Sequence, residues 1–238
     1  MGFYEEKLVP VIREVCGVIE ETPHMQDILK GTMPYEKFRF QIKQNYQYLL
    51  DYTRCWAVGF SKCSCFAEME EWYQIVKNTM EGTVMVNRDF WAEQVGVSLE
   101  EMDAVMEAPA KRSYTAFQLM CAEQGGLAEC MMALFPCNIL YRFFGEDLLP
   151  KCLLPEDNMY YQWLAFYVSE AYLNKTDNEI RMVNRLCRNK TEREQAKLLE
   201  IFAAGCNYEI LQWQDMYQNM TTWPLDHIFP KKFTMVEE

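Results

Sequence analysis

The sequence predicts an all-α fold. Apolar residues recur three or four positions apart along almost the whole chain, which is the spacing of one face of a helix. The alternating pattern of strands and the Asn-Gly or Asp-Gly turns of hairpins are missing from the sequence. Glycines and prolines fall mostly between the periodic segments, where helices end. We therefore expect a compact helical bundle with its functional side chains on inward faces.

Breaks in this periodicity set the expected helix boundaries. In chain order the expected helices are 3–21, 35–64, 68–81, a shorter pair within 88–105, 110–124, 127–144, 158–173, 177–187 and 192–219. The breaks between them fall at Gly31 to Pro34, Gly82, Gly96, Pro109, Gly125 and Gly126, and the stretch 145–155. Ser98 with Glu101, and Thr191 with Glu194, have the form of a capping box, which favours helix starts there.

Length and charge narrow the class of protein. The chain has 238 residues, half of them apolar, so we expect one domain over 1–238. Lys and Arg total 23 against 35 Asp and Glu, a formal charge of −12. A surface of this sign repels phosphate backbones and anionic membranes, so we expect neither nucleic acid nor a membrane as partner. No apolar stretch approaches the ~18 to 20 uncharged residues of a membrane span.

The cysteines indicate a reducing compartment. Ten are scattered through a long chain, and no apolar segment follows a basic start at the N-terminus, so we expect a cytoplasmic protein. Cys63 and Cys65 form the only tight pair, without a second pair or histidines at zinc-finger spacing. A metal site is therefore not expected.

Histidine is scarce, with only His24 and His227. This removes most routes to a histidine-based triad or a histidine-rich metal site, so catalysis would have to use Cys, Glu, Asp or Tyr. His24 could serve as a haem ligand, but a lone histidine beside a loop is more often a surface or capping group, and we expect the second role.

The segment from Leu134 to Tyr141 is the most informative. Cys137 and Tyr141 lie four residues apart inside an apolar helix, so their side chains share one face. Pro136 beside the cysteine favours a local irregularity of the helix. Cys137 could instead simply pack in the core, since buried cysteines are common.

Four segments in order resemble the thiaminase II (TenA) family over nearly the entire chain. They are Tyr35-x-x-Phe38 through Gln44-Asn-Tyr-Gln-Tyr-Leu49 with Tyr52, Arg54 and Ala57; Tyr114-Thr-x-Phe117 with Gly126-x-x-Ala-Glu129, Ala133-Leu-x-Pro-Cys137 and Tyr141; Trp163-Leu-x-x-Tyr167; and Tyr208-Glu209 with Trp213 and Met216. One such segment alone would be weak evidence for the resemblance. Four segments in the same order and at compatible separations do not match by chance.

The resemblance implies a haem-oxygenase-like helical bundle without haem, often a homotetramer, that needs no cofactor. It implies hydrolysis of a small molecule, thiamine or the thiamine breakdown product 4-amino-5-aminomethyl-2-methylpyrimidine, the product of the latter being the hydroxymethylpyrimidine. Matched position by position, Cys137 is the nucleophile and Glu209 the acid and base. The substrate-binding residues are the pocket tyrosines Tyr48, Tyr114, Tyr141 and Tyr167, together with Asn45, which stands where the family has aspartate.

These residue types suit that reaction. Tyrosines give a flat aminopyrimidine both stacking rings and fixed polar groups. A thiolate that adds to the ring breaks its aromaticity and lets the amine depart, while a carboxylic acid protonates the amine. Glu209 lies on an apolar stripe with Phe202, Cys206 and Trp213. A carboxylate buried there requires a hydrogen-bonding or charged partner, or a functional role, and burial should raise its pKa. The alternative is that Glu209 has no role in catalysis and faces the solvent, as most helical glutamates do.

Two other functions stay open. Asn45 and Gln212, the second of which replaces an aromatic residue of the family pattern, allow an enzyme of the same fold that acts on a different small heterocycle. A non-catalytic pyrimidine-binding or regulatory protein is the other, although the presence of both Cys137 and Glu209 counts against it.

Overall fold

The protein is described by a computed structural model that covers residues 2–218 and Trp223. Every regular element within 2–218 is helical, which confirms the all-α prediction. The α-helices are α1 (Val9–Glu20), α2 (Pro23–Lys30), α3 (Tyr35–Phe60), α4 (Phe66–Thr79), α5 (Ala92–Gln94), α6 (Leu99–Asp103), α7 (Pro109–Gln124), α8 (Leu127–Leu148), α9 (Met159–Phe166), α10 (Glu170–Cys187) and α11 (Glu192–Gln218). Short π-helical turns at Tyr4–Leu8, Met80–Val84 and Val86–Trp91, and a 3₁₀ turn at Leu149–Lys151, complete them.

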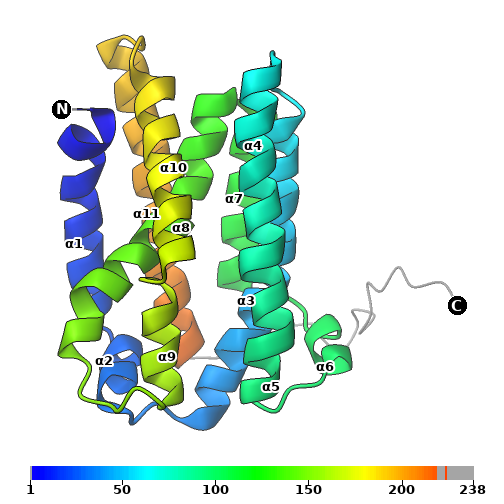
Figure 1. Cartoon of the computed structure of the whole chain (residues 1–238), viewed down its shortest axis with the longest axis vertical. Coiled ribbons are helices and arrows are strands. Elements are labelled where there is room, and N and C mark those ends of the chain that lie inside the picture. Colours follow the sequence, from blue (N-terminus) through cyan, green and yellow to red (C-terminus); the bar gives the residue numbers. More distant parts are fainter. Residues whose placement is uncertain (1, 219–222, 224–238) are drawn as a thin grey trace, which may run out of the picture.

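The long helices run along the length of the molecule, and α2, α5, α6 and α9 lie toward one end (Figure 1). Helix α8 is central, because it packs against α1, α3, α7, α10 and α11. All of its residues from Cys130 to Tyr141 are buried, and a helix that is apolar on every side belongs inside the core. The segment Leu127–Lys151 is also long and apolar enough to cross a membrane, but 78% of its apolar window is buried inside the protein.

Both predicted capping boxes are present. Ser98 accepts a hydrogen bond from the Glu101 amide at 3.1 Å, while the Glu101 carboxylate accepts one from the Ser98 amide at 2.9 Å. Thr191 and Glu194 make the same reciprocal pair, at 3.3 Å and 2.8 Å. Side chains at these two positions therefore satisfy amides that a helix start leaves open.

Helix α2 was not predicted. It begins at Pro23, whose ring suits the first turn, and Thr22 accepts a hydrogen bond from the Met25 amide at 3.3 Å. It ends at Gly31, whose φ of 69° lies in the left-handed region that glycine adopts without strain. The eight residues of α2 are too few to show clear periodicity in the sequence.

The predicted break between 173 and 177 is wrong. The chain bends earlier, at Tyr167 to Ser169, and α10 then runs unbroken from Glu170 to Cys187. Ser169 caps the new helix by accepting a hydrogen bond from the Tyr172 amide at 3.4 Å. Inside the helix, the Thr176 hydroxyl donates to the Tyr172 carbonyl at 3.0 Å, so this polar residue is accommodated without ending it.

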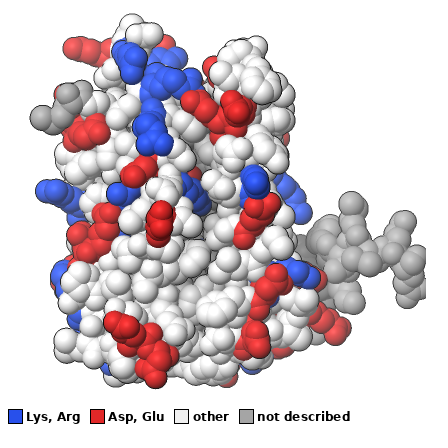
Figure 2. All heavy atoms as spheres, in the orientation of Figure 1, with Lys and Arg blue, Asp and Glu red and all other residues white. Residues whose placement is uncertain are grey.

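Charge is dispersed over the surface. Figure 2 shows acidic side chains scattered along one face of the molecule, with a short run of adjoining basic side chains near its upper end and separate ones elsewhere. Most of the ion pairs among the described residues are exposed or half-exposed, as between Arg39 and Glu101 at 3.0 Å. Such pairs contribute little to stability, so burial of the helix faces holds the fold together.

Candidate active site

Helices α8 and α11 come into close contact beside Cys137. Pro136 lies inside α8 without ending it. A Cβ atom on Gly205 of α11 would stand 2.8 Å from Cγ of Pro136, so only glycine allows α11 to approach this closely. Glu209 lies one helical turn beyond Gly205, on the buried face of α11. The close approach therefore brings the carboxyl group of Glu209 near enough to the Cys137 thiol to affect its pKa.

The carboxyl group of Glu209 is fully buried. Burial raises its pKa to about 7, against the opposing effects of Lys111, Tyr114 and Gln212. The amide of Gln212 donates to Oε2, whereas Oε1 is buried without a partner in the described part of the chain. The Tyr114 hydroxyl favours the carboxylate, but its geometry falls short of a full hydrogen bond. A carboxyl group with this pKa can both donate and accept a proton near neutrality.

The thiol of Cys137 is 8% exposed. Burial, with a further contribution from Glu209, raises its pKa to about 12, while Tyr48, Lys111 and Lys175 act in the opposite direction. Gln118 Nε2 donates to the Tyr48 hydroxyl oxygen at 2.9 Å, which leaves the hydroxyl proton of Tyr48 available to the sulfur atom. The resting thiol is therefore protonated, with donors in place that favour a thiolate.

The four predicted tyrosines surround this pair. Tyr48 stacks on Tyr114 with ring centroids 5.5 Å apart, and together they form one aromatic wall. Tyr141 and Tyr167, with centroids 4.9 Å apart, form a second wall. Burial raises the pKa of all four hydroxyls well above the usual value, and both Cys137 and Glu209 add to the shift in each case. Six of the seven predicted site residues are thus gathered in one cluster.

Asn45 is the seventh. It lies on α3, one helical turn before Tyr48, and is half-buried. Its side chain makes no hydrogen bond to any residue that the structure describes. The role of Asn45 in substrate binding stays a prediction.

The sequence prediction missed several buried polar residues around the cluster. Lys111 and Gln118 lie on the same face of α7 as Tyr114, and each is at most 1% exposed. Behind Cys137, Lys175 donates to Asn138 Oδ1 at 3.0 Å, and Asn138 Nδ2 donates to Glu179 Oε1 at 2.8 Å. Their spacing from Tyr114 could have flagged Lys111 and Gln118, at i−3 and i+4, but polar residues on a helix usually face water.

The expectation that His24 is a surface or capping group is wrong. Its side chain is fully buried in α2, where Nε2 is 2.7 Å from Gln41 Oε1 and the ring packs edge-on against Trp213 at 4.6 Å. Burial lowers its pKa to about 4. His24 thus joins α2 to α3 and α11 as a neutral core residue. His227 lies outside the described residues.

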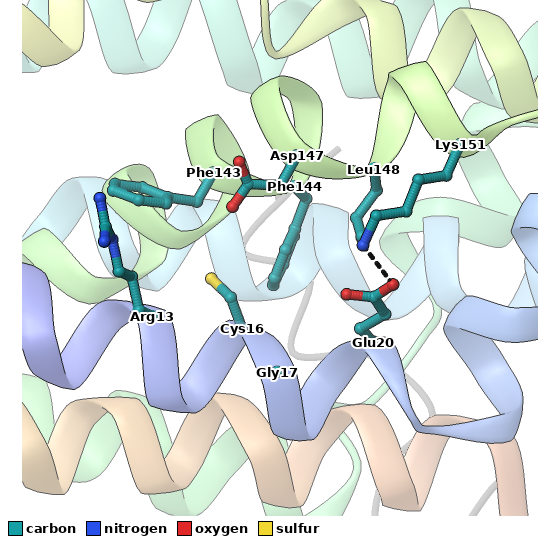
Figure 3. A pocket seen from close by; sticks show the side chains of 9 residues that line it. All are labelled: Arg13, Cys16, Gly17, Glu20, Phe143, Phe144, Asp147, Leu148 and Lys151. Atoms are coloured by element: carbon teal, nitrogen blue, oxygen red, sulfur yellow. Dashed lines mark hydrogen bonds and ion pairs between the residues drawn. The ribbon is translucent and has the colours of Figure 1, made fainter.

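A surface groove of about 360 Å³ lies between α1 and the end of α8, apart from the cluster (Figure 3). In it, Lys151 pairs with Glu20 at 2.5 Å. Burial raises the pKa of the Cys16 thiol there, and Asp147 and Glu20 add to the shift, so this cysteine lacks the donors that surround Cys137. No group of three His, Cys, Asp or Glu side chains suited to a metal ion occurs within the described residues.

Comparisons with known proteins show the family to which this chain is related. The family model described as TENA/THI-4/PQQC matches residues 17–219. An aminopyrimidine aminohydrolase from Halalkalibacterium halodurans is 29% identical over 201 residues, which cover 84% of this chain and 89% of that protein. The aminopyrimidine aminohydrolase of Bacillus subtilis is 29% identical over 196 residues, 82% of each chain.

Solved structures confirm the fold. A TenA homologue from P. horikoshii superposes with a TM-score of 0.80 at 24% identity, over 91% of this chain and 99% of that one. The helices described above therefore have the haem-oxygenase-like arrangement of TenA proteins.

Proposed function

This chain belongs to the TENA/THI-4/PQQC family, and from that membership we propose that it is a hydrolase of thiamine-derived aminopyrimidines. The substrate we favour is 4-amino-5-aminomethyl-2-methylpyrimidine, and the products are ammonia and the hydroxymethylpyrimidine; thiamine itself is a second candidate. One observation carries the proposal. A thiol and a carboxyl group lie buried between two walls of tyrosines, beside polar atoms that have no partner in the described chain.

In the proposed mechanism, the Cys137 proton passes to the Glu209 carboxylate, and the thiolate adds to the ring carbon next to the one that bears the aminomethyl group. The electron pair of that ring double bond forms an exocyclic alkene and expels the amine, which takes the proton from Glu209 and leaves as ammonia. Water then adds to the alkene and gives a proton to Glu209. The electrons return to the ring, the bond to sulfur breaks, and the thiolate recovers its proton.

The residues around the pair support these roles. Tyr48 and Lys111 favour the negative sulfur that the first step requires. Glu209, with a pKa of about 7, can cycle between acid and base. Tyr114, Gln118 and Gln212 each present a buried oxygen atom without a partner in the described chain, and these atoms can bind the amino groups of a pyrimidine.

Purified protein should release one molecule of ammonia from the aminomethylpyrimidine for each molecule of hydroxymethylpyrimidine that it forms. Cys137→Ser keeps the shape of the site but replaces the nucleophile, so we expect turnover to fall by more than about a hundredfold with pyrimidine binding largely kept. Cys16→Ser, in the surface groove, is the matched control and should retain activity. Ordinary turnover by the Cys137 variant would exclude the cysteine mechanism. Binding without turnover by the unaltered protein would favour a regulatory role instead.

We further propose that the chain forms a single domain that works as a cytoplasmic homotetramer. Helix α4 supports self-association, because Phe66, Met69 and Tyr73 lie on one face and are 78%, 41% and 53% exposed. Apolar side chains that cluster at helical spacing on a surface favour a protein interface. Sedimentation equilibrium of the whole chain tests this state, and a monomer at micromolar concentration would contradict it.

A further inference from the structure

Lys111 is a buried ammonium group without a bonded partner. It is the third residue of α7, three positions before Tyr114, and is 1% exposed. Its Nζ atom stands 4.4 Å from the centre of the Tyr48 ring. It makes no hydrogen bond and no ion pair with the residues that the structure describes. An ammonium group carries three donors, and buried charges are normally paired, so this side chain has donors to offer a ligand.

The second buried lysine shows the contrast. Lys175, 7% exposed, donates to Asn138 at 3.0 Å, and Asn138 in turn donates to Glu179, so its charge is held by a protein network. Lys111 has instead the face of the Tyr48 ring, and otherwise only more distant charges. Burial lowers its pKa, and the charges of Glu209, Cys137 and Glu107 oppose this effect without a direct contact.

Lys111 contacts the ring of Tyr48, which lies one helical turn after Asn45 on α3. Gln44, the neighbour of Asn45, accepts a hydrogen bond from the Ala108 amide at 2.7 Å and donates to the Met106 carbonyl at 3.0 Å. The start of α7 is thereby fixed beside the turn of α3 that carries Asn45 and Tyr48. The family resemblance puts aspartate at the place of Asn45, so an acidic acceptor is replaced here by an amide, on the turn of α3 that ends at Tyr48, whose ring Lys111 contacts.

The cluster therefore offers a ligand hydrogen-bond acceptors from one set of residues and a charged donor from Lys111. Buried oxygen atoms of Gln118, Glu209 and Gln212, unpaired within the described chain, can accept from amino groups of a ligand. Lys111 can only donate. A ring edge that is protonated would meet repulsion at Lys111, whereas an edge with an oxygen atom would gain a charge-assisted hydrogen bond.

We propose that Lys111 binds the substrate directly and that this site takes a 5-aminomethylpyrimidine with a ring oxo group in place of the ring amino group. The inference rests on the proposed C–N hydrolysis and extends it from aminopyrimidines to the ring-oxo counterpart. Lys111 is then a specificity-determining residue that selects an acceptor at the ring edge.

The same chemistry proceeds on an oxo substrate. When the Cys137 thiolate adds to the ring carbon, the electron pair of the ring double bond moves onto the oxo oxygen, and the Lys111 ammonium stabilises the enolate. The enolate then reforms its carbonyl and expels the amine with the proton of Glu209, leaving the exocyclic alkene. Water adds to that alkene and returns a proton to Glu209, and a second enolate expels the thiolate. The sum is again hydrolysis with release of ammonia.

Binding of two unreactive products tests the proposal. The dissociation constants of 5-hydroxymethyl-2-methylpyrimidin-4-one and of its 4-amino counterpart are measured by calorimetry on the unaltered chain and on Lys111→Met. We expect the unaltered chain to bind the oxo compound at least as tightly as the amino compound. The Lys111 variant should lose about tenfold or more for the oxo compound and less than about threefold for the amino compound, the scale of a hydrogen bond from a charged group.

Controls separate binding from folding. Lys37 also stands over a tyrosine ring, Tyr217 at 3.5 Å, but outside the cluster, so Lys37→Met should leave both constants unchanged. Lys111→Gln keeps a donor without the charge and is used beside Lys111→Met, with thermal unfolding measured for each. The comparison of the two compounds on the unaltered chain does not depend on any variant.

Three other results of these measurements would contradict the proposal. Equal losses for both compounds in the Lys111 variants would make the lysine structural and overturn the proposal. Binding of the amino compound alone by the unaltered chain would overturn this inference and leave the proposed function standing. Binding of neither compound, with no ammonia released from either aminomethyl substrate, would overturn both.

Discussion

The chemistry depends on how burial changes single side chains. An exposed thiol and an exposed carboxyl group have pKa values of about 8.5 and 4.3, which are far apart. In this site the pKa of Glu209 is raised to about 7, while that of Cys137 is raised to about 12. Glu209 thus becomes suited to proton transfer near neutrality, and Cys137 becomes a nucleophile only when Tyr48, Lys111 and Lys175 favour its charged form.

Glu209→Gln removes the exchangeable proton and keeps the shape. We expect kcat to fall by about 10²–10⁴ with a much smaller change in KM, because the amine then leaves without a proton donor. Steady-state kinetics with the aminomethylpyrimidine measure this. Glu192→Gln, at the exposed first turn of α11, is the control and should keep both constants. A raised KM with unchanged kcat would make Glu209 a binding residue.

Asn45→Asp restores the acid of the family pattern. An ionised aspartate accepts hydrogen bonds from an amino group and favours a protonated ring, so we expect tighter binding or faster turnover of the aminomethylpyrimidine by roughly 1–2 kcal/mol, or about tenfold. The ratio kcat/KM for that substrate, compared with the unaltered chain, is the measurement. If it does not change, Asn45 does not set specificity.

At the scale of elements, the site depends on the contact between α8 and α11. Gly205→Ala places a methyl group 2.8 Å from the Pro136 ring, so α11 must shift. We expect a loss of about 1–3 kcal/mol in the free energy of unfolding, the usual cost of overpacking, and a lower kcat because Glu209 lies one turn further along.

Gly17 on α1 provides the matched control, since a Cβ atom there meets nothing within 4 Å. Gly17→Ala should leave activity unchanged and stabilise the protein by up to about 1 kcal/mol through helix propensity. Denaturant unfolding and kcat of both variants test the pair. Equal effects of the two substitutions would show that the α8–α11 contact does not position Glu209.

At the scale of the whole molecule, buried titratable groups make stability depend on pH. The pKa of His24 is lowered from 6.5 to about 4, so its contribution to stability is present above pH 6.5 and lost as the pH falls from there through 4. The pKa values of Glu179 and Glu209 are raised from 4.5 to about 7, so their contribution is present below pH 4.5 and lost as the pH rises through 7.

The histidine effect can be isolated with His24→Gln, which does not titrate but can still bond to Gln41. From pH 7 to pH 4, we expect the free energy of unfolding of the unaltered chain to fall relative to this variant by roughly 3 kcal/mol, at about 1.4 kcal/mol for each pKa unit. Urea unfolding at several pH values measures the difference. A difference that does not vary with pH would show that His24 is not buried in neutral form.

Local patterns in the sequence were enough to predict the helical class, and with the family resemblance they predicted most of the proposed catalytic cluster. Periodicity is local, so the apolar repeats predicted the long helices, and the stripe of Phe202, Cys206, Glu209 and Trp213 predicted a buried carboxyl group. The family resemblance added the four tyrosines, which the structure gathers around Cys137 and Glu209.

Which polar residues are buried depends on the packing of helices that are distant in the sequence. Lys111 and Gln118 are polar residues on a helix, and their spacing from Tyr114 is too weak a signal to separate them from solvent-facing residues. They are buried because α7 packs against α3 and α8, and Gln118 is held by Tyr48, a residue 70 positions away. The same holds for His24 on α2, whose partners are supplied by α3 and α11. Contacts between distant helices set the burial, and burial sets the pKa values and open donors on which the chemistry depends.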